Sequence, residues 1–331
     1  MPIETPLTSL LGIKHPILSA PMAIIAGSRL VRAVGDAGGF GILGGGYGDK
    51  DWLEKETTKL QASAAPFGIG FITWSLAKRA ELLDIALNAK PRAIMLSFGD
   101  VRPFASRIKA AGSLLICQVQ TEDMAKQALD AGADILIAQG TEAGGHGASR
   151  TTFDIVPSLI DLAAGRVPVV AAGGIADGRG LAAMMVLGAS GVLLGTRFYA
   201  SVECDGAEEA KRRICAANSG ETVRGVIFDV SRQIWWPAPF TARTLINDHA
   251  RRWMGREAEL VHNVEAVAAE YATARDAGNY DVAAVFAGGA AGLIHDIPPA
   301  AEIVERIARE ADQILSGQRN SPNAPLAVNA R

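Results

Sequence analysis

The most reactive side chain in the centre of this chain is a histidine set among glycines. His146 lies in a GGHG run at 144–147, shortly after an apolar segment at 135–138. An imidazole can take up a proton near neutral pH, so His146 is a candidate general base. A histidine in a turn can equally do no more than hold the loop through a hydrogen bond. Glu142 is the other ionisable candidate nearby, and we expect it to cap neighbouring N–H groups.

Two pairs of small residues end the next two apolar segments. Gly173-Gly174 follows 168–172, and Gly195-Thr196 follows 191–194. Glycines at such points let backbone N–H groups approach a ligand, and the N-terminus of the helix expected at 181–187 would add positive charge. Either pair alone can simply form a tight turn. Two such turns on successive strands favour a phosphate site like that of many parallel barrels.

The remaining strand ends carry amides and hydroxyls that cannot readily transfer protons at neutral pH. A site with so few acids and bases is easiest to explain if a bound cofactor performs the chemistry. Gln118 and Gln139 can reach the polar edge of a flavin ring. The three cysteines have no metal-like spacing, and we expect no metal. The polar residues at these ends are Ser19, Ser97, Gln118, Gln139 and Thr141.

Eight short apolar segments recur at regular spacing, and turn or helix patterns separate them. Serial strand–helix units without an antiparallel hairpin signature favour a closed barrel over an open sheet. The predicted strands are 17–22, 40–43, 67–72, 93–98, 114–119, 135–138, 168–172 and 191–194. The predicted helices are 28–37, 50–63, 76–89, 122–131, 181–187 and 206–217, the last of which completes the ring.

The sequence after 217 departs from this rhythm, because it is rich in aromatic and charged residues. We predict an α/β protein: a (β/α)8 TIM barrel with a smaller, mainly helical cap inserted before the last helix. Helical patterns occur at 244–253 and 262–277, and the cap is expected beside the barrel mouth. The alternative is an extra layer on the side of the barrel. The predicted divisions are 1–217 for the barrel, 218–290 for the cap, 291–317 for a segment whose helix (298–315) packs back on the barrel, and 318–331 for a disordered tail.

Composition narrows the class of partner. The net charge of -3 gives no basic surface for nucleic acid. The longest charge-free stretch, 181–196, is interrupted by glycines and is shorter than the roughly 20 apolar residues of a membrane span. No signal-peptide pattern is found, and an odd number of cysteines indicates a reducing compartment. We therefore expect a cytoplasmic protein with a small-molecule substrate. The sequence leaves the oligomeric state open, with a homodimer as one candidate.

Several motifs, spread in order over nearly the whole chain, resemble the nitronate monooxygenase family, formerly called 2-nitropropane dioxygenases. The most specific of them is QGTEAGGHG at 139–147, since the glycine turns alone occur in several phosphate-binding barrels. The others are PILSAPM at 16–22, GFGILG at 39–44, AAGGIADGRG at 171–180, GTRF at 195–198 and GLIHDIPPAA at 292–301.

The resemblance implies a (β/α)8 barrel with a smaller helical domain and non-covalently bound FMN. It implies that His146 is the base that removes the α-proton of a nitroalkane. Gly70 stands where one branch of the family has an asparagine, and Gln118 stands where some relatives have a lysine. The implied flavin and phosphate contacts are Ala20, Pro21, Met22, Gly70, Gln118, Gln139, Gly144, Gly145, Gly173, Gly174, Gly195 and Thr196.

The implied reaction is the flavin-dependent oxidation of alkyl nitronates by O2 to a carbonyl compound and nitrite. Neutral nitroalkanes are further candidate substrates if His146 acts as the base. Three alternatives stay open: an FMN-dependent NAD(P)H:quinone or enoyl-thioester reductase of the same superfamily, an IMP dehydrogenase-like enzyme, and a catalytically silent phosphate-binding protein. The second of these needs a cysteine nucleophile after the sixth strand, and 141–152 contains none.

Overall fold

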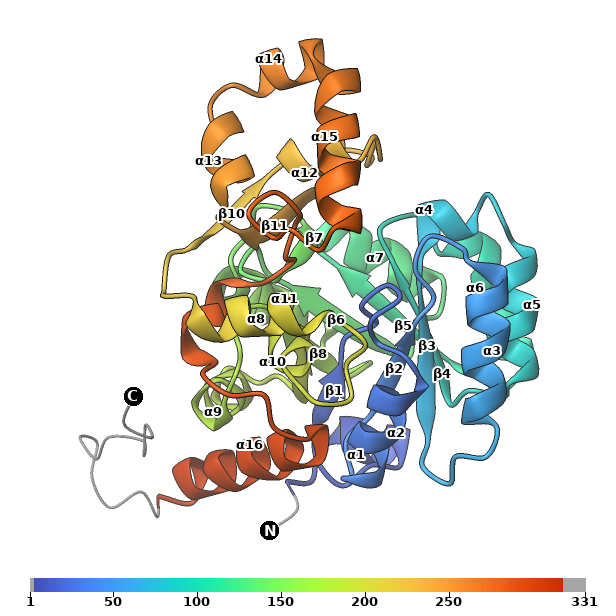
Figure 1. Ribbon diagram of the computed structural model, residues 1–331. Coiled ribbons are helices and arrows are strands. Elements are labelled where there is room, and N and C mark those ends of the chain that lie inside the picture. The colour runs from blue at the N-terminus through green and yellow to red at the C-terminus, as the bar shows by residue number, and fades with distance from the viewer. Residues whose placement is uncertain (1–2, 318–331) are drawn as a thin grey trace.

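Eight parallel strands form the centre of the protein in the computed structural model, which describes residues 3–317 (Figure 1). Their order around the sheet is β1-β9-β8-β6-β5-β4-β3-β2. All eight predicted strands are present, with ends that differ from the prediction by a few residues at most. The strands are β1 (Ile17–Ser19), β2 (Gly41–Gly44), β3 (Phe67–Ile72), β4 (Ala93–Ser97), β5 (Leu114–Val119), β6 (Ile135–Gln139), β8 (Val169–Ala172) and β9 (Gly191–Leu194).

The first and last strands of this order are joined through Phe40. Phe40 forms a parallel bridge with Leu18. Its N–H donates to the Ile17 carbonyl at 2.9 Å, and its carbonyl accepts from the Ser19 N–H at 3.0 Å. These two bonds close the sheet into a barrel, which confirms the predicted fold class.

The barrel is filled by one face of its strands and plugged at its amino-terminal end. Buried side chains such as Phe40, Ile42, Met95 and Ile116 form one apolar cluster inside it. Leu7 and Leu11 of α1 (Pro6–Leu11) belong to the same cluster, so this short helix closes the bottom of the barrel. The opposite face of each strand packs against the outer helices, as expected for parallel strands with apolar residues on both faces.

The predicted outer helices are present, but the prediction lacked α6 and α8, and one position of the ring is filled by a different helix. α16 packs against both α9 and α2, so the C-terminal helix, and not the predicted helix 206–217, completes the ring. The predicted helix 76–89 is present only as α5, which begins at Glu81, and the separate short helix α4 ends at Leu76. These helices are α2 (Ser28–Asp36), α3 (Lys50–Leu60), α4 (Thr73–Leu76), α5 (Glu81–Asn88), α6 (Arg102–Ala110), α7 (Glu122–Asp130), α8 (Thr152–Ala163), α9 (Gly178–Val186), α10 (Thr196–Tyr199), α11 (Glu208–Ala216) and α16 (Ala300–Leu315).

A group of four helices, α12 to α15, stands above the barrel (Figure 1). Apolar side chains such as Trp253 and Leu260 give it a small core of its own. A predicted helix at 244–253 is wrong in its first half, because the chain is a strand up to Leu245 and the helix begins at Asp248, capped by Asn247. The helices are α12 (Ile227–Ser231), α13 (Asp248–Trp253), α14 (Glu257–His262) and α15 (Val264–Asp276).

A three-stranded antiparallel sheet, absent from the sequence prediction, joins this cap to the barrel. Its order is β10-β11-β7. β10 (Thr222–Gly225) and β11 (Thr241–Leu245) come from the cap segment, whereas β7 (Gly145–Gly147) belongs to the loop after β6. The cap therefore consists of helices that stand on a small β-sheet. The boundaries 1–217, 218–290 and 291–317 remain predictions, and the tail 318–331 lies outside the described residues.

Within residues 3–317, no helix is long and apolar enough to cross a membrane.

Candidate functional site

The small sheet fixes the position of His146. In β7, His146 pairs with Ala242 of β11, and its carbonyl accepts a hydrogen bond of 3.0 Å from the Gln139 side-chain amide. Gln139 ends β6 and in turn accepts from the Gln120 amide at 2.7 Å. His146 is therefore held between the barrel mouth and the base of the cap, on regular structure rather than on a free loop.

A buried carboxylate on α12 pairs with the His146 ring. Nε2 of His146 lies 2.9 Å and 3.0 Å from the two carboxylate oxygens of Asp229. The His146 and Asp229 side chains are only 7% and 6% exposed. Because a carboxylate has no proton to donate, Nε2 carries the hydrogen and Nδ1 keeps the lone pair. The pair is thus arranged so that Nδ1 can accept a proton.

Burial keeps this imidazole neutral. The low-polarity surroundings lower the pKa of His146 below its ordinary 6.5, and this effect outweighs the opposing influence of the Asp229 carboxylate. The positive charges of Arg232 and Arg224 lower the same pKa further. At neutral pH His146 is therefore a free base.

Aromatic side chains from the cap and from three barrel loops enclose the histidine. Trp236 stacks on the His146 ring, with centroids 3.4 Å apart and planes inclined by 8°. The same indole packs edge-on against Trp74 and Phe98, and its N–H donates to the Tyr47 hydroxyl at 3.1 Å. Tyr47, Trp74 and Phe98 follow β2, β3 and β4. The cap therefore lies over the barrel mouth rather than along its side.

Two arginines of the small sheet hold the loop that carries His146. Nη2 of Arg224 donates to the carbonyls of Thr141 and Ala143 at 2.9 Å and 2.8 Å, and Nε of Arg243 donates to Thr141 at 2.8 Å. Burial and the neighbouring Arg243 charge lower the pKa of Arg224 to about 10. Glu142 caps α8, since its carboxylate accepts from the Thr152 N–H and hydroxyl at 2.9 Å and 2.7 Å. The predicted capping role of Glu142 is confirmed.

The two glycine turns lie where the sequence placed them, at the ends of β8 and β9. Gly173 and Gly174 have φ of 110° and 72°, a region that favours glycine. Among residues 3–317, no acceptor pairs with the N–H groups of Gly173, Gly174 or Gly195. The Thr196 hydroxyl accepts from the Gly288 N–H at 2.8 Å, so the return loop from the cap closes over this turn. Free N–H donors on two adjacent strand ends suit an anionic group.

The helix that follows Gly174 does not contribute to this turn as expected. α9 begins only at Gly178, and the Asp177 carboxylate caps it by accepting from the Arg179 and Gly180 N–H groups. The Gly178 N–H donates to Glu310 of α16 at 3.0 Å. Two carboxylates thus occupy the positive end of α9, and the short α10, which starts at Thr196, is the helix beside the turns.

The other predicted contacts line the same end of the barrel. The Gln118 side chain is buried yet makes no hydrogen bond with the described residues, which leaves its amide available to a ligand. A Cβ on Gly70 would lie 2.5 Å from the Pro21 ring, so the glycine lets the turn of Ala20, Pro21 and Met22 lie against β3. A Cβ on Gly144 would lie 2.7 Å from the Gly288 nitrogen, so this position has no room for a larger side chain. Gly145 has φ of 69°, a backbone conformation that favours glycine.

These features fit FMN. Unpaired N–H donors suit its phosphate, and the Gln118 amide, with the glycine- and proline-lined floor, suits the edge and face of its ring. Whether each of these residues touches the flavin remains a prediction. Among residues 3–317, no group of three or more His, Cys, Asp or Glu side chains could hold a metal ion.

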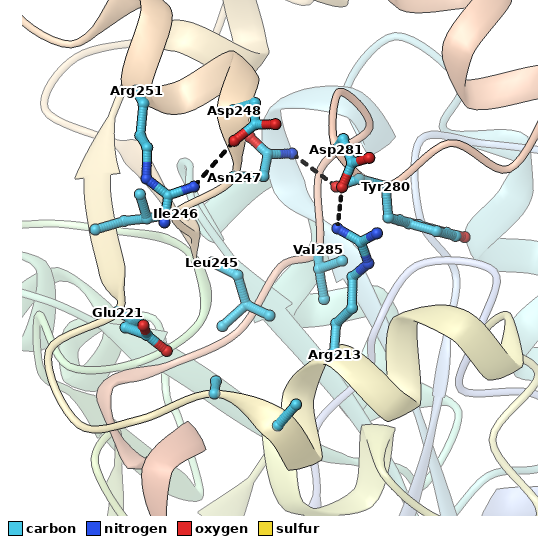
Figure 2. A pocket seen from close by; sticks show the side chains of 12 residues that line it. Arg213, Glu221, Leu245, Ile246, Asn247, Asp248, Arg251, Tyr280, Asp281 and Val285 are labelled. Atoms are coloured by element: carbon cyan, nitrogen blue, oxygen red, sulfur yellow. Dashed lines mark hydrogen bonds and ion pairs between the residues drawn. The ribbon is translucent and has the colours of Figure 1, made fainter.

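A separate cavity of about 220 Å³ lies between α11 and the cap, and none of the predicted site residues lines it (Figure 2). Its charged side chains largely pair with one another: Arg213 with Asp281 at 2.8 Å and Arg251 with Asp248 at 3.1 Å. We therefore take the barrel mouth, and not this cavity, as the candidate site.

Sequence reasoning missed Asp229, Trp236 and the two arginines of the small sheet. Each lies at least 78 positions beyond His146 along the chain, and only the β7–β11 pairing brings them together. A signal was present for Asp229, because it is the single acid in the otherwise apolar run at 226–230. A lone acid in such a run indicates a buried partner.

Comparisons with known proteins agree with this geometry. The family model for nitronate monooxygenase matches residues 4–81 and 72–310. Nitronate monooxygenase npaC of Metarhizium robertsii is 34% identical over 336 residues, which cover 91% of this chain and 92% of that protein. FabK of Thermotoga maritima superposes with a TM-score of 0.83 at 33% identity, covering 96% of this chain and 99% of that one.

A further relative is named as a dehydrogenase rather than as a monooxygenase. The (3aS,4S,5R,7aS)-5-hydroxy-7a-methyl-1-oxo-octahydro-1H-indene-4-carboxyl-CoA dehydrogenase of Mycobacterium tuberculosis is 37% identical over 225 residues. That alignment covers 67% of this chain and 63% of the relative, so the chain spans less than two thirds of the mycobacterial protein. The family match over most of the chain is decisive: this chain belongs to the nitronate monooxygenase family of oxidoreductases.

Proposed function

We propose that this protein is an FMN-dependent enzyme that oxidises alkyl nitronates with O2 to a carbonyl compound and nitrite. We propose further that it accepts neutral nitroalkanes, with His146 as the base. The observation that carries the proposal is the buried His146–Asp229 pair beside the phosphate-type glycine turns. Small-molecule substrates and O2 are its proposed partners, and a cytoplasmic location stays a prediction.

Different residues of the chain would bind the phosphate, the ring edge and the ring face of FMN. Gly173, Gly174, Gly195 and Thr196 would hold the FMN phosphate through N–H groups and a hydroxyl. Gln118 and Gln139 would face the ring edge, and Ala20, Pro21, Met22 and Gly70 would form the surface beneath the ring. When bound, FMN supplies an acceptor for electrons from the nitronate carbanion, and O2 completes the oxidation.

His146 and its surroundings carry out the proton step. Nδ1 of neutral His146 would take the α-proton of a nitroalkane, which leaves a nitronate and an imidazolium. Asp229 would stabilise that imidazolium through the Nε2–H bond, which becomes stronger once the ring is charged. The aromatic enclosure around Trp236 would exclude water from the nitronate. A general base that is held next to the proton it removes typically raises the reaction rate 10²–10⁴-fold.

The substitution His146→Asn tests this assignment with two substrates. We expect kcat/KM for neutral nitroethane to fall about 10²–10⁴-fold, because proton abstraction loses its base. Preformed ethylnitronate needs no abstraction, and much of the activity on it should remain. His262→Asn, an exposed histidine on α14, is the matched control. An equal loss on both substrates would show that His146 is not the base.

A second candidate is a flavin-dependent NAD(P)H reductase or dehydrogenase. The similarity to the mycobacterial CoA-thioester dehydrogenase favours it. This candidate requires fast reduction of the flavin by NADH or NADPH, whereas the first requires reduction by a nitronate.

A further inference from the structure

Tyr47 stands at the barrel mouth, within the aromatic enclosure of His146. It follows β2 in a glycine-rich turn, and its carbonyl accepts a hydrogen bond of 3.0 Å from the Ser75 hydroxyl. Its ring packs edge-on against Trp74 and Trp236, with its centroid 6.1 Å from that of each. Trp236 also covers the His146 ring, so a single indole links the tyrosine to the proposed base. The phenol is therefore held in place through both its backbone and its ring.

The hydroxyl oxygen of Tyr47 accepts two hydrogen bonds, but its own hydrogen has no acceptor. The Trp236 N–H donates to this oxygen at 3.1 Å, and the Arg232 guanidinium donates to it as well. Both partners act only as donors, since neither an indole N–H nor a guanidinium offers a lone pair. Among the hydrogen bonds within residues 3–317, none has the Tyr47 hydroxyl as its donor. The hydroxyl hydrogen is therefore available to a bound molecule.

The surroundings keep this hydroxyl protonated and strengthen it as a donor. Burial raises the pKa of Tyr47 above its ordinary 10.0, and this effect outweighs the opposing charge of Arg232. Nη1 of Arg232 also forms an ion pair with an Asp229 carboxylate oxygen at 3.9 Å, so the guanidinium connects the tyrosine to the partner of His146. A hydrogen bond that a hydroxyl oxygen receives polarises its O–H bond and makes it a better donor.

The proton step of the proposed reaction creates a charge that such a donor would stabilise. Removal of the α-proton converts the C–N bond of a nitroalkane into a C=N bond and places the negative charge on the two nitro oxygens. The proton goes to Nδ1 of His146. The nitro oxygens accept only weak hydrogen bonds in the neutral substrate, and stronger ones once they are charged. A donor at these oxygens therefore stabilises the transition state more than the substrate.

We propose that the Tyr47 hydroxyl donates a hydrogen bond to a nitro oxygen of the substrate and stabilises the charge that develops there as His146 takes the α-proton. Tyr47 keeps its own proton throughout. The inference rests on the proposed function, and it assigns a second catalytic residue to the proton step. The same hydrogen bond would hold a preformed nitronate, whose oxygens are already charged when it binds.

The first test is Tyr47→Phe, which removes the hydroxyl and keeps the ring that packs against Trp236. We expect kcat/KM for nitroethane to fall about 10- to 150-fold, as for the loss of a hydrogen bond to a charged oxygen. With preformed ethylnitronate we expect KM to rise by a similar factor while kcat stays close to the wild-type value, since the bond is present before that reaction begins. Tyr280→Phe is the matched control, because Tyr280 lines the separate cavity of Figure 2.

The second test needs no turnover. Nitrate is a planar oxyanion without a carbon to oxidise, and its binding to the FMN-loaded protein is read from the shift in flavin absorbance. We expect nitrate to bind about tenfold or more weakly to Tyr47→Phe than to the wild type, and Tyr280→Phe to bind it as the wild type does.

The two tests separate this inference from the proposed function. If the wild type oxidises no nitronate yet binds nitrate through Tyr47, the proposed function fails and the oxyanion donor stands. If nitrate binds no more tightly to the wild type than to Tyr47→Phe, the role of Tyr47 is wrong and the proposed function is unaffected. A fall in kcat rather than a rise in KM on ethylnitronate would equally overturn that role, because it would show a structural effect.

Discussion

The substitution Asp229→Asn isolates the effect of a single charge on the proposed base. The new amide side chain would have nearly the same shape as the carboxylate, but the negative charge 2.9 Å from His146 Nε2 would be lost. The amide nitrogen can also donate to Nε2, which would move the ring hydrogen to Nδ1 and block the basic lone pair. Both effects oppose proton abstraction by His146.

The magnitude follows from the geometry of the pair. A hydrogen bond to a charged partner is worth about 1.5–3 kcal/mol, and the imidazolium–carboxylate form of this bond exists only after the proton has moved. We therefore expect kcat/KM for neutral nitroethane to fall about 10- to 150-fold. Because Asp229 raises the pKa of His146 against the effect of burial, its loss should lower that pKa further. The acid limb of the pH profile should move to lower pH while the plateau falls.

The assay is a pH profile of kcat/KM for nitroethane, measured in parallel with preformed ethylnitronate. Asp248→Asn is the matched control, since Asp248 is an exposed acid of the cap whose side chain is 77% exposed. Ethylnitronate should lose far less activity than nitroethane. If both substrates lose activity equally, or if the acid limb moves to higher pH, the reasoning about Asp229 is wrong.

Two further predictions concern the cofactor and the enclosure. Gly174→Asp should weaken FMN binding about tenfold or more, because it places a negative charge in the phosphate turn. Gly165→Asp is the control, because Gly165 also has a positive φ, 74°, and a side chain there would meet no other atom. In an ultrafiltration assay of bound FMN, the control variant should retain the occupancy of the wild type. Trp236→Leu should expose His146 and raise its pKa toward 6.5, so activity on neutral nitroethane should begin to fall at a higher pH as the solution is acidified. An unshifted acid limb would show that Trp236 does not maintain the low pKa.

The barrel was predictable because each strand carries its own local signal. A parallel strand buried on both faces appears as a short apolar run, and β8 and β9 each end at the glycines that form the turn. The positions of Gly173, Gly174, Gly195 and His146 relative to the strands followed directly from that pattern. The motif resemblance then supplied a cofactor and a reaction.

The surroundings of His146 were not predictable in the same way. Asp229 lies 83 residues from it along the chain, and their contact depends on β7 pairing with β11. β7 reads Gly-His-Gly, and β10 and β11 contain arginine and threonine, so none of these short strands has a strong apolar pattern. The ring position of α16 was missed for a related reason, because the cap separates that helix from the strands it covers.

The most direct test of the central claim is to mix the FMN-loaded protein anaerobically with ethylnitronate and to follow the flavin absorbance. The proposed function predicts that the absorbance bleaches, and that nitrite forms once air is admitted. A flavin that stays oxidised with nitronates but bleaches with NADH or NADPH would contradict it and establish the reductase instead.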